Sequence, residues 1–357
     1  MVILSVGKSS WNISVPTNEF IKEGIVNNYN ESYASGAGMA SNVAYLLSKW
    51  GANAVLSSMV GSDDYGTKLK REFTDLSAKT DYIETTYDKE TSLDITLVNT
   101  QNKSKTVINV STELSLIKKY NFEFTADIVF TDCFDYGASQ NAFTKYPGAI
   151  TIVGASVSTP EVLEMCKYSK YIICNRDFAE TNTGIKIDIS NPQSLVEAYN
   201  RLQNKYPKAI IILSLDVNGA VYQSGNQIKI MPGLNVEVVD RTGAGDAFKA
   251  AFIYCLTNNF DMDKSIVMSN IAAGLTVTKM GSRVSFPSLS EVINTYNQKM
   301  GLVADSNAQT AQPAPTEQQV QPQPQVQPIA QTNAQAVPEQ PVQGQVPPVQ
   351  TPPAGQS

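Results

Sequence analysis

One acid, Asp246, directly follows a turn of three small residues, Gly243-Ala244-Gly245, and precedes an apolar stretch at 247–256. Small residues let backbone N–H groups approach a ligand, and a helix N-terminus attracts negative charge through its unpaired amides and dipole. Asp246 cannot bind an anion by charge, so it is either a catalytic acid or base beside a phosphate or a residue that caps the helix. The segment therefore predicts a site where a phosphate group binds and reacts.

The elements around this turn follow a regular pattern. The valines of 236–239 predict a strand before the turn, and 247–256 predicts a buried helix after it. Elsewhere apolar strand candidates alternate with helical segments, which predicts an α/β fold with a mostly parallel central sheet flanked by helices. The expected strands are 2–7, 54–60, 127–131, 149–153, 171–174 and 209–215, and the expected helices include 40–50, 160–167 and 192–204.

Composition restricts the chemistry and the partners. The chain of 357 residues has no histidine, so a general base must be a carboxylate or a lysine. The net charge of -6 and the lack of a Lys/Arg cluster argue against nucleic acid or an anionic membrane as a partner. No apolar stretch is long enough to span a membrane, and the opening residues are too few for a signal segment. The four cysteines lack CxxC spacing, which favours buried thiols in a reducing, cytoplasmic setting.

The segment 240–248 resembles the C-terminal signature of the ribokinase-like carbohydrate kinase family (PfkB type). Four further segments follow the family's order. Residues 38–44 are similar to its sugar-binding glycine and asparagine segment, and 60–66 is similar to its VGxDxxG stretch. Residues 213–219 are similar to its nucleotide-binding strand and turn, and 276–285 to the stretch that closes the nucleotide pocket. The resemblance covers about 1–296 and implies the ribokinase-like fold.

The resemblance also implies an activity and its residues. The family transfers phosphate from ATP to an alcohol, with Asp246 as general base and the amides of Gly243, Ala244 and Gly245 as the anion hole. The implied cofactors are ATP with Mg²⁺, with K⁺ as a further cation that some members hold. The implied sugar-binding residues are Asn12, Gly38, Met39, Asn42 and Asp246; those for the nucleotide are Asn175, Ser214, Asp216, Gly219, Gly245 and Asn270; those for the monovalent cation are Asp240, Thr242, Thr276, Gly281 and Ser285. Asn270 is equally consistent with a packed polar residue of a helix.

The resemblance divides the chain into a kinase domain, 1–300, and a tail. In the family, a small β-sheet lid covers the sugar site, and the strand-like segments at about 12–35 and 82–112 are expected to form it here. An ordinary surface hairpin is the alternative. Lid edges of this family often pair, so a homodimer through the lid is expected. Residues 301–357 are rich in Gln and Pro and predict a disordered, extended tail whose partner the sequence does not indicate.

Several positions depart from the family's pattern. Asn12 stands where many members have an aspartate, Ala37 replaces a glycine, and Phe178 replaces a glutamate associated with the metal. Asp216 replaces a glycine of the nucleotide turn, and Arg241 adds a cation beside the anion hole. The first hypothesis is a ribokinase- or fructokinase-like enzyme that phosphorylates the hydroxymethyl group of a sugar. The alternatives are a weakly active or inactive binding or regulatory member, or a kinase for a nucleoside or a heptose phosphate.

Overall fold

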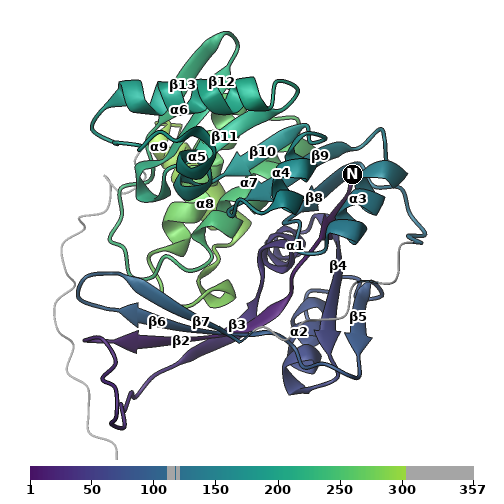
Figure 1. Ribbon diagram of the computed structural model, residues 1–357, viewed down its shortest axis with the longest axis vertical. Coiled ribbons are helices and arrows are strands. Elements are labelled where there is room, and N and C mark those ends of the chain that lie inside the picture. Colours follow the sequence, from purple (N-terminus) through teal and green to yellow (C-terminus); the bar gives the residue numbers. More distant parts are fainter. Residues whose placement is uncertain (111–116, 118–120, 303–357) are drawn as a thin grey trace, which may run out of the picture. The chain divides into compact units, whose positions relative to one another are not determined.

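The computed structural model describes residues 1–110, 117 and 121–302, and a central sheet organises them (Figure 1). Within these residues nine strands form the sheet in the order β13-β12-β11-β10-β9-β8-β1-β4-β5. All neighbours pair in parallel except β11 with β12 and β12 with β13, which are antiparallel. The predicted mostly parallel sheet is confirmed. Its strands are β1 (Val2–Val6), β4 (Asn53–Gly61), β5 (Ile83–Thr86), β8 (Ile128–Thr131), β9 (Ile150–Ala155), β10 (Tyr171–Cys174), β11 (Ile210–Ser214), β12 (Ala220–Ser224) and β13 (Gln227–Met231).

Helices cover both faces of this sheet. Successive side chains of a strand point to opposite faces, and in β8 Phe130 and Val129 accordingly belong to different apolar clusters. One face packs against α1 (Met39–Lys49), α7 (Ala244–Thr257) and α8 (Met262–Thr276), with α9 (Leu289–Lys299) behind α8. The other packs against α3 (Tyr136–Lys145), α4 (Pro160–Cys166), α5 (Arg176–Thr183) and α6 (Pro192–Lys205). Strands buried on both faces explain the continuous apolar runs of the sequence.

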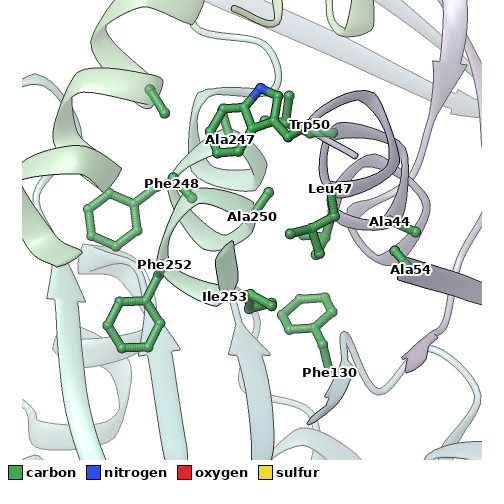
Figure 2. Close-up of a cluster of buried hydrophobic side chains, with 14 of the residues drawn as sticks. Ala44, Leu47, Trp50, Ala54, Phe130, Ala247, Phe248, Ala250, Phe252 and Ile253 are labelled. Carbon is green, nitrogen blue, oxygen red and sulfur yellow. The ribbon is translucent and has the colours of Figure 1, made fainter. Parts of the chain in front are cut away.

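Helix α7 lies against α1 above the middle of the sheet. Figure 2 shows Leu47 of α1 and Ala250 and Ile253 of α7 gathered near Phe130 of β8. The small side chains on α7, such as Ala247 and Ala250, are fully buried, so the two helices pack closely. This packing fixes the position of the first turn of α7, which carries Asp246.

A second, smaller sheet has the strand order β3-β2-β6-β7. Strand β2 (Ser10–Thr17) pairs antiparallel with β3 (Tyr33–Ala37) and parallel with β6 (Leu93–Asn99), and β6 pairs antiparallel with β7 (Lys105–Val110). The parallel pairing of β2 with β6 joins segments about eighty residues apart in the sequence, so this sheet is not a simple surface hairpin. Helix α2 (Asp64–Thr74) packs on β2 and β3. We call this four-stranded sheet the lid.

Two elements predicted from the sequence are wrong, the strand at 236–239 and the start of the lid segment 82–112. Residues 236–239 form no strand. Val239 and the following Asp240 both donate their N–H groups to the carbonyl of Val277, and the described residues show no ladder with a neighbouring strand there. The predicted lid segment 82–112 also begins too early. Strand β5 within it pairs with β4 at the edge of the central sheet, where Ile83 joins the main apolar cluster. Residues 111 and 112 lie outside the described residues.

Other expectations concern the tail, the thiols and the membrane. The predicted disordered tail lies outside the described residues except for 301 and 302. All four cysteines are buried and unpaired, as the sequence predicts. Among the described residues, every helix is too short or too polar to cross a membrane.

Candidate active site

A cavity of about 510 Å³ lies between the carboxyl ends of three central strands, the first turn of α7 and the tip of the lid. Ser156 and Asn175 follow the ends of β9 and β10, and Ser214 ends β11. In open α/β sheets, ligands bind outside the carboxyl ends of the strands, so the position of this cavity is the one that the fold favours. The lid contributes Lys103, Ser104 and Lys105, and α7 contributes Ala244, Gly245, Asp246, Phe248 and Lys249.

Asp246 lines this cavity in the first turn of α7. Gly243 caps the helix with a left-handed backbone (φ 82°), and a Cβ there would lie 2.8 Å from the Phe286 ring, so glycine is required. The N-cap residue of α7 is this glycine, so it offers no side-chain cap, and Asp246 is the acid of the first turn, where a helix N-terminus favours negative charge. Asn42 Nδ2 of α1 donates to Asp246 Oδ2 at 2.8 Å. Burial raises the pKa of the Asp246 carboxyl above its ordinary value, while the charge of Lys249 and the Asn42 hydrogen bond oppose the shift.

The three expected anion-hole amides are not equivalent. The N–H of Ala244 is directed at the carbonyl of Arg241, at a long 3.4 Å. Among the described residues, no backbone or side-chain oxygen accepts the N–H of Gly243 or Gly245. Unpaired amides at a helix N-terminus bind anions. Gly243 and Gly245 are therefore the two donors available to a phosphoryl group beside Asp246.

A buried chain of polar contacts holds Asn42 in place. Arg283, only 2% exposed, donates from Nε to Asn42 Oδ1 at 3.0 Å and pairs through its terminal nitrogens with Glu72 and Ser41. Its guanidinium also lies over the rings of Tyr45 and Phe73, 4.6 and 5.2 Å from their centroids. Because Arg283 takes the amide oxygen of Asn42, the amide nitrogen must point to Asp246. The network Glu72–Arg283–Asn42 thus orients the candidate base.

A second acid, Asp132, lies near Asp246. It follows strand β8, and its carboxylate accepts N–H groups from Lys8, Ala40 and Phe134 at 3.0 to 3.1 Å. Ala40 belongs to the first turn of α1, where a helix favours negative charge. Burial nevertheless raises the pKa of Asp132 to about 6, and the charge of Asp246 adds to the shift. Asp132 has no sequence motif that would have predicted its place in the site.

The residues expected at the nucleotide border the cavity. Ser214 donates to the carbonyl of Cys174 at 3.0 Å, and Asn175 caps helix α5 by accepting the N–H of Phe178 at 2.9 Å. Gly219 has φ 102°, and a Cβ there would lie 1.9 Å from the carbonyl oxygen of Met231, so the turn approaches its neighbour too closely for any side chain. The exposed residue that begins this turn is Asp216.

Asn270 lines the cavity and also has a structural role. Its Nδ2 donates to the carbonyls of Met231 and Pro232 at 3.3 and 3.2 Å, which ties the end of β13 to α8. Asn270 therefore has a packing role in the structure, and its role at the nucleotide stays a prediction.

The residues expected at the sugar are placed unequally. Met39 lines the cavity, and Gly38 begins α1 beside it with φ 95°. Asn12 is buried in the lid, where its Nδ2 donates to Thr96 and its Oδ1 accepts from Ser14. Asn12 does not line the cavity, and its side-chain atoms already have partners. The structure thus brings Met39, Asn42 and Asp246 together but leaves Asn12 within the lid.

The residues expected at a monovalent cation meet only in part. Asp240 is buried, and its carboxylate accepts the N–H and hydroxyl of Thr242 and the N–H of Gly281 at 2.7 to 3.0 Å. The hydroxyls of Thr276 and Ser285 donate to carbonyls of their own turns. Among the described residues, no three acidic or sulfur side chains form a metal cluster. A cation at this loop would therefore depend on backbone carbonyls together with Asp240.

Phe178 is buried in the apolar cluster beneath α5 and does not line the cavity. The acids beside it do not replace a glutamate there. Asp177 is exposed, and Glu180 pairs with Lys186 and accepts the N–H of Ile187. The described residues thus offer no carboxylate from α5 to the cavity.

Three further residues of the site, Arg283, Glu72 and Lys249, were not predicted from the sequence. Arg283 and Glu72 are 211 positions apart, and nothing in the sequence pairs them. Lys249 did have a detectable feature, because it interrupts an otherwise apolar run three residues after Asp246.

Comparisons with known proteins agree with this geometry. Solved structures share the fold: a putative ribokinase from Agrobacterium tumefaciens matches with a TM-score of 0.75 at 20% identity, covering 84% of this chain and 98% of that one. Arabidopsis thaliana ribokinase, determined with ribose and ATP, matches with a TM-score of 0.66 at 18% identity, covering 83% and 98%. The model of the pfkB family carbohydrate kinases matches residues 3–132 and 138–289, so the chain belongs to this family of ribokinase-like kinases.

Two relatives align over most of the chain. The bifunctional protein HldE of Campylobacter fetus is 26% identical over 285 residues, which cover 78% of this chain and 61% of that protein. This chain therefore spans about three fifths of that relative. Ribokinase of Haemophilus influenzae is 25% identical over 277 residues, which cover 74% of this chain and 88% of that protein. These relatives differ in name at equal similarity, so identity alone does not select the substrate.

Proposed function

We propose that this protein transfers the γ-phosphoryl group of ATP to a hydroxymethyl group of a sugar or sugar derivative. The observation that carries the proposal is Asp246, which lies in the cavity beside the unpaired amides of Gly243 and Gly245 and is oriented by Asn42. A base next to an anion site is what phosphoryl transfer to an alcohol needs. The family of carbohydrate kinases, with ribokinases among its relatives, supports the same class of reaction.

In the proposed reaction the alcohol oxygen attacks the γ-phosphorus as its proton passes to Asp246. The bond between the γ-phosphorus and the bridging oxygen breaks, and ADP leaves with that electron pair. Gly243 and Gly245 donate to the oxygens of the transferred group and stabilise its charge. Ser214, Asn175 and Gly219 border the part of the cavity proposed for the nucleotide.

Metal ions are part of the proposal. The described residues offer no cluster of three acids, which fits a Mg²⁺ held mainly by nucleotide phosphates. When bound, Mg²⁺ would neutralise phosphate charge. For K⁺ we propose the loop around Asp240 and Thr242, which Gly281 joins through its N–H. Asp240 already has three donors, so K⁺ would modulate the loop rather than hold it together.

A sugar phosphate is the second candidate acceptor. Lys103 and Lys105 of the lid line the cavity and supply positive charge where the lid closes it. An acceptor that carries a phosphate would gain from these cations, whereas a neutral nucleoside would not. Because proteins named bifunctional protein HldE are as similar to this chain as ribokinases are, we include sugar phosphates among the acceptors to be tested.

The test is ADP release from MgATP across pentoses, hexoses, sugar phosphates and nucleosides, with and without K⁺. Asp246→Asn should lose most turnover, by about 10²- to 10⁴-fold, because it removes a positioned base. Its MgADP affinity should stay within a few-fold of wild type. The matched control is Glu161→Gln, which neutralises an exposed carboxylate in the first turn of α4, outside the cavity.

Turnover of one alcohol that Asp246→Asn loses and Glu161→Gln retains would support the proposal. Equal turnover by Asp246→Asn and wild type would refute the mechanism. Nucleotide binding without turnover of any alcohol would favour a binding or regulatory protein.

A further inference from the structure

Lys249 is a buried lysine that forms no ion pair within the part of the chain that the structure describes. It lies on α7 one turn after Asp246 and is 8% exposed. Its Nζ donates to the carbonyl of Gly245 at 3.1 Å, and no ion pair in the described part of the chain includes it. An ammonium group has three donors, so this one hydrogen bond leaves two of them unused.

Lys249 also lines the cavity, together with Ser156, Asn175 and Ser214. The other cations that border the cavity are Lys103 and Lys105 of the lid and Arg241 before α7, and none of these three is buried. Among the cations that line the cavity, Lys249 is therefore the one held by the core, and its position does not depend on the lid.

Packing alone does not explain this lysine. Burial lowers the pKa of Lys249, and the nearby acids Asp246 and Asp132 oppose the shift. Lysine is rarely buried unless it is paired, because removing its charge from water is costly. Its sequence neighbours Phe248 and Ala250 are apolar and buried, and the Nζ hydrogen bond to Gly245 satisfies only one of its three donors. An anionic ligand would supply the missing partner.

We propose that Lys249 is a phosphate-binding residue whose ammonium group contacts the terminal phosphates of the nucleotide from below the anion hole. The proposal rests on the proposed function and adds a residue to it. Gly243 and Gly245 would donate to the phosphoryl group from the helix N-terminus, and Lys249 would add its charge from one turn further along α7, in the same cavity lining. Lysine binds phosphate as a point charge, which suits a group that moves from ATP to the acceptor.

The experiment compares Lys249→Met, Lys249→Gln and Lys249→Arg in the full chain. Calorimetry with MgADP, MgATP and AMP measures affinity without requiring turnover. Lys249→Met should bind MgADP about 10- to 100-fold more weakly, the range of one charged hydrogen bond. Lys249→Arg should recover part of this loss, and AMP affinity should change less than about threefold, because AMP lacks the terminal phosphates.

The control Lys167→Met removes one exposed lysine at the end of α4, so it matches the change in net charge. Melting without nucleotide separates binding from structure. We expect Lys249→Met to melt at or above the wild-type temperature while MgADP raises its melting temperature less. A structural lysine would give the opposite pair of results, a lower melting temperature and an unchanged MgADP effect, and this would overturn the proposal.

The outcomes also separate this proposal from the proposed function. If Lys249→Met and Lys249→Gln keep wild-type MgADP affinity while the wild type turns over a sugar, only the role of Lys249 is wrong. If the Lys249 variants lose affinity but the wild type turns over no alcohol, only the catalytic proposal is wrong. A wild type that binds no MgADP overturns both. Should Lys249→Met and Lys249→Gln both fail to fold without ligand, the lysine is structural and the proposal fails.

Discussion

Removing Glu72 tests whether the network behind Asp246 is a buried ion pair. Glu72 of α2 is the acidic partner of Arg283, and both of its oxygens also accept the N–H of Gly36. Glu72→Ala would leave the guanidinium with Ser41 and Asn42 as its polar partners. The arginine would then carry a buried charge without its ion-pair partner.

The magnitude follows from burial. Removing one partner of a buried pair costs about 3–5 kcal/mol, because the other charge stays desolvated. The Glu72 side chain is 23% exposed, so water can enter beside it and the lower end, about 3 kcal/mol, applies. A domain of about 300 residues unfolds with an entropy of about 0.6 kcal/mol/K, so the melting temperature should fall by about 5 °C.

The assay is urea and thermal unfolding of Glu72→Ala, with Glu197→Ala as the matched control. Glu197 pairs with Arg201 at 2.9 Å, but these side chains are 51% and 57% exposed. An exposed pair is worth about 0.2–1 kcal/mol, so the control should melt within about 1–2 °C of wild type. The double variant Glu72→Ala/Arg283→Met removes both charges and should be more stable than Glu72→Ala.

Activity gives an independent readout. The double variant should lower kcat, because Asn42 loses Arg283 and with it the orientation toward Asp246. Glu72→Ala keeps the contact between Arg283 and Asn42 and should lower kcat less. A loss of stability below 1 kcal/mol in Glu72→Ala, equal to that in Glu197→Ala, would refute the buried-pair reasoning. A double variant with normal kcat would refute the role of Arg283 in orienting Asn42.

Three further changes test separate parts of the site. Gly219→Ala should lower the free energy of unfolding by more than the ~1–3 kcal/mol of left-handed backbone strain, because the new Cβ would also clash with the carbonyl of Met231. Gly184→Ala, with φ 69° and open space around it, should lose only the strain energy. Urea unfolding of both variants measures the difference. Phe178→Glu should lower stability by about 3 kcal/mol or more in the same assay, because it buries an unpaired carboxylate, and a stable variant would contradict this. The pKa of Asp132, about 6, exceeds its ordinary value, so the contribution of this group to folding stability is complete below about pH 4 and is lost as the pH rises through 6. Relative to Asp132→Asn, the free energy of unfolding of wild type should increase by on the order of 1 kcal/mol between pH 7 and pH 5. An equal pH dependence in the two proteins would refute the shift.

Local patterns in the sequence were sufficient to predict most of the fold. The apolar runs that became β1, β8 and β10 were predictable because strands buried on both faces need nearly every side chain to be apolar. The turn at Gly243–Gly245 was predictable because a left-handed cap followed by an apolar helix has a short sequence signature. Asp246 could be singled out for the same reason.

The errors arose where tertiary contacts decide the local structure. The valines of 236–239 have strand-like residue types, but Val239 and Asp240 donate to one shared carbonyl, that of Val277, and a single carbonyl cannot form a ladder. Ile83 begins a short strand that resembles those of the lid, but it pairs with β4 because its side chain completes the core of the central sheet. Sequence propensity does not specify which sheet a short strand joins.

The orientation of the candidate base depends on contacts between three remote segments. Asn42 comes from α1, Asp246 from α7 and Arg283 from the loop after α8, and 204 and 241 positions separate Asn42 from its two partners. Local sequence rules predict the structure of each segment but not that the three segments contact one another. What joins them is the packing of small residues between α1 and α7, visible in Figure 2, which sets the distance between Asn42 and Asp246. In this protein, therefore, the hydrophobic core below the cavity is part of the machinery that positions the base.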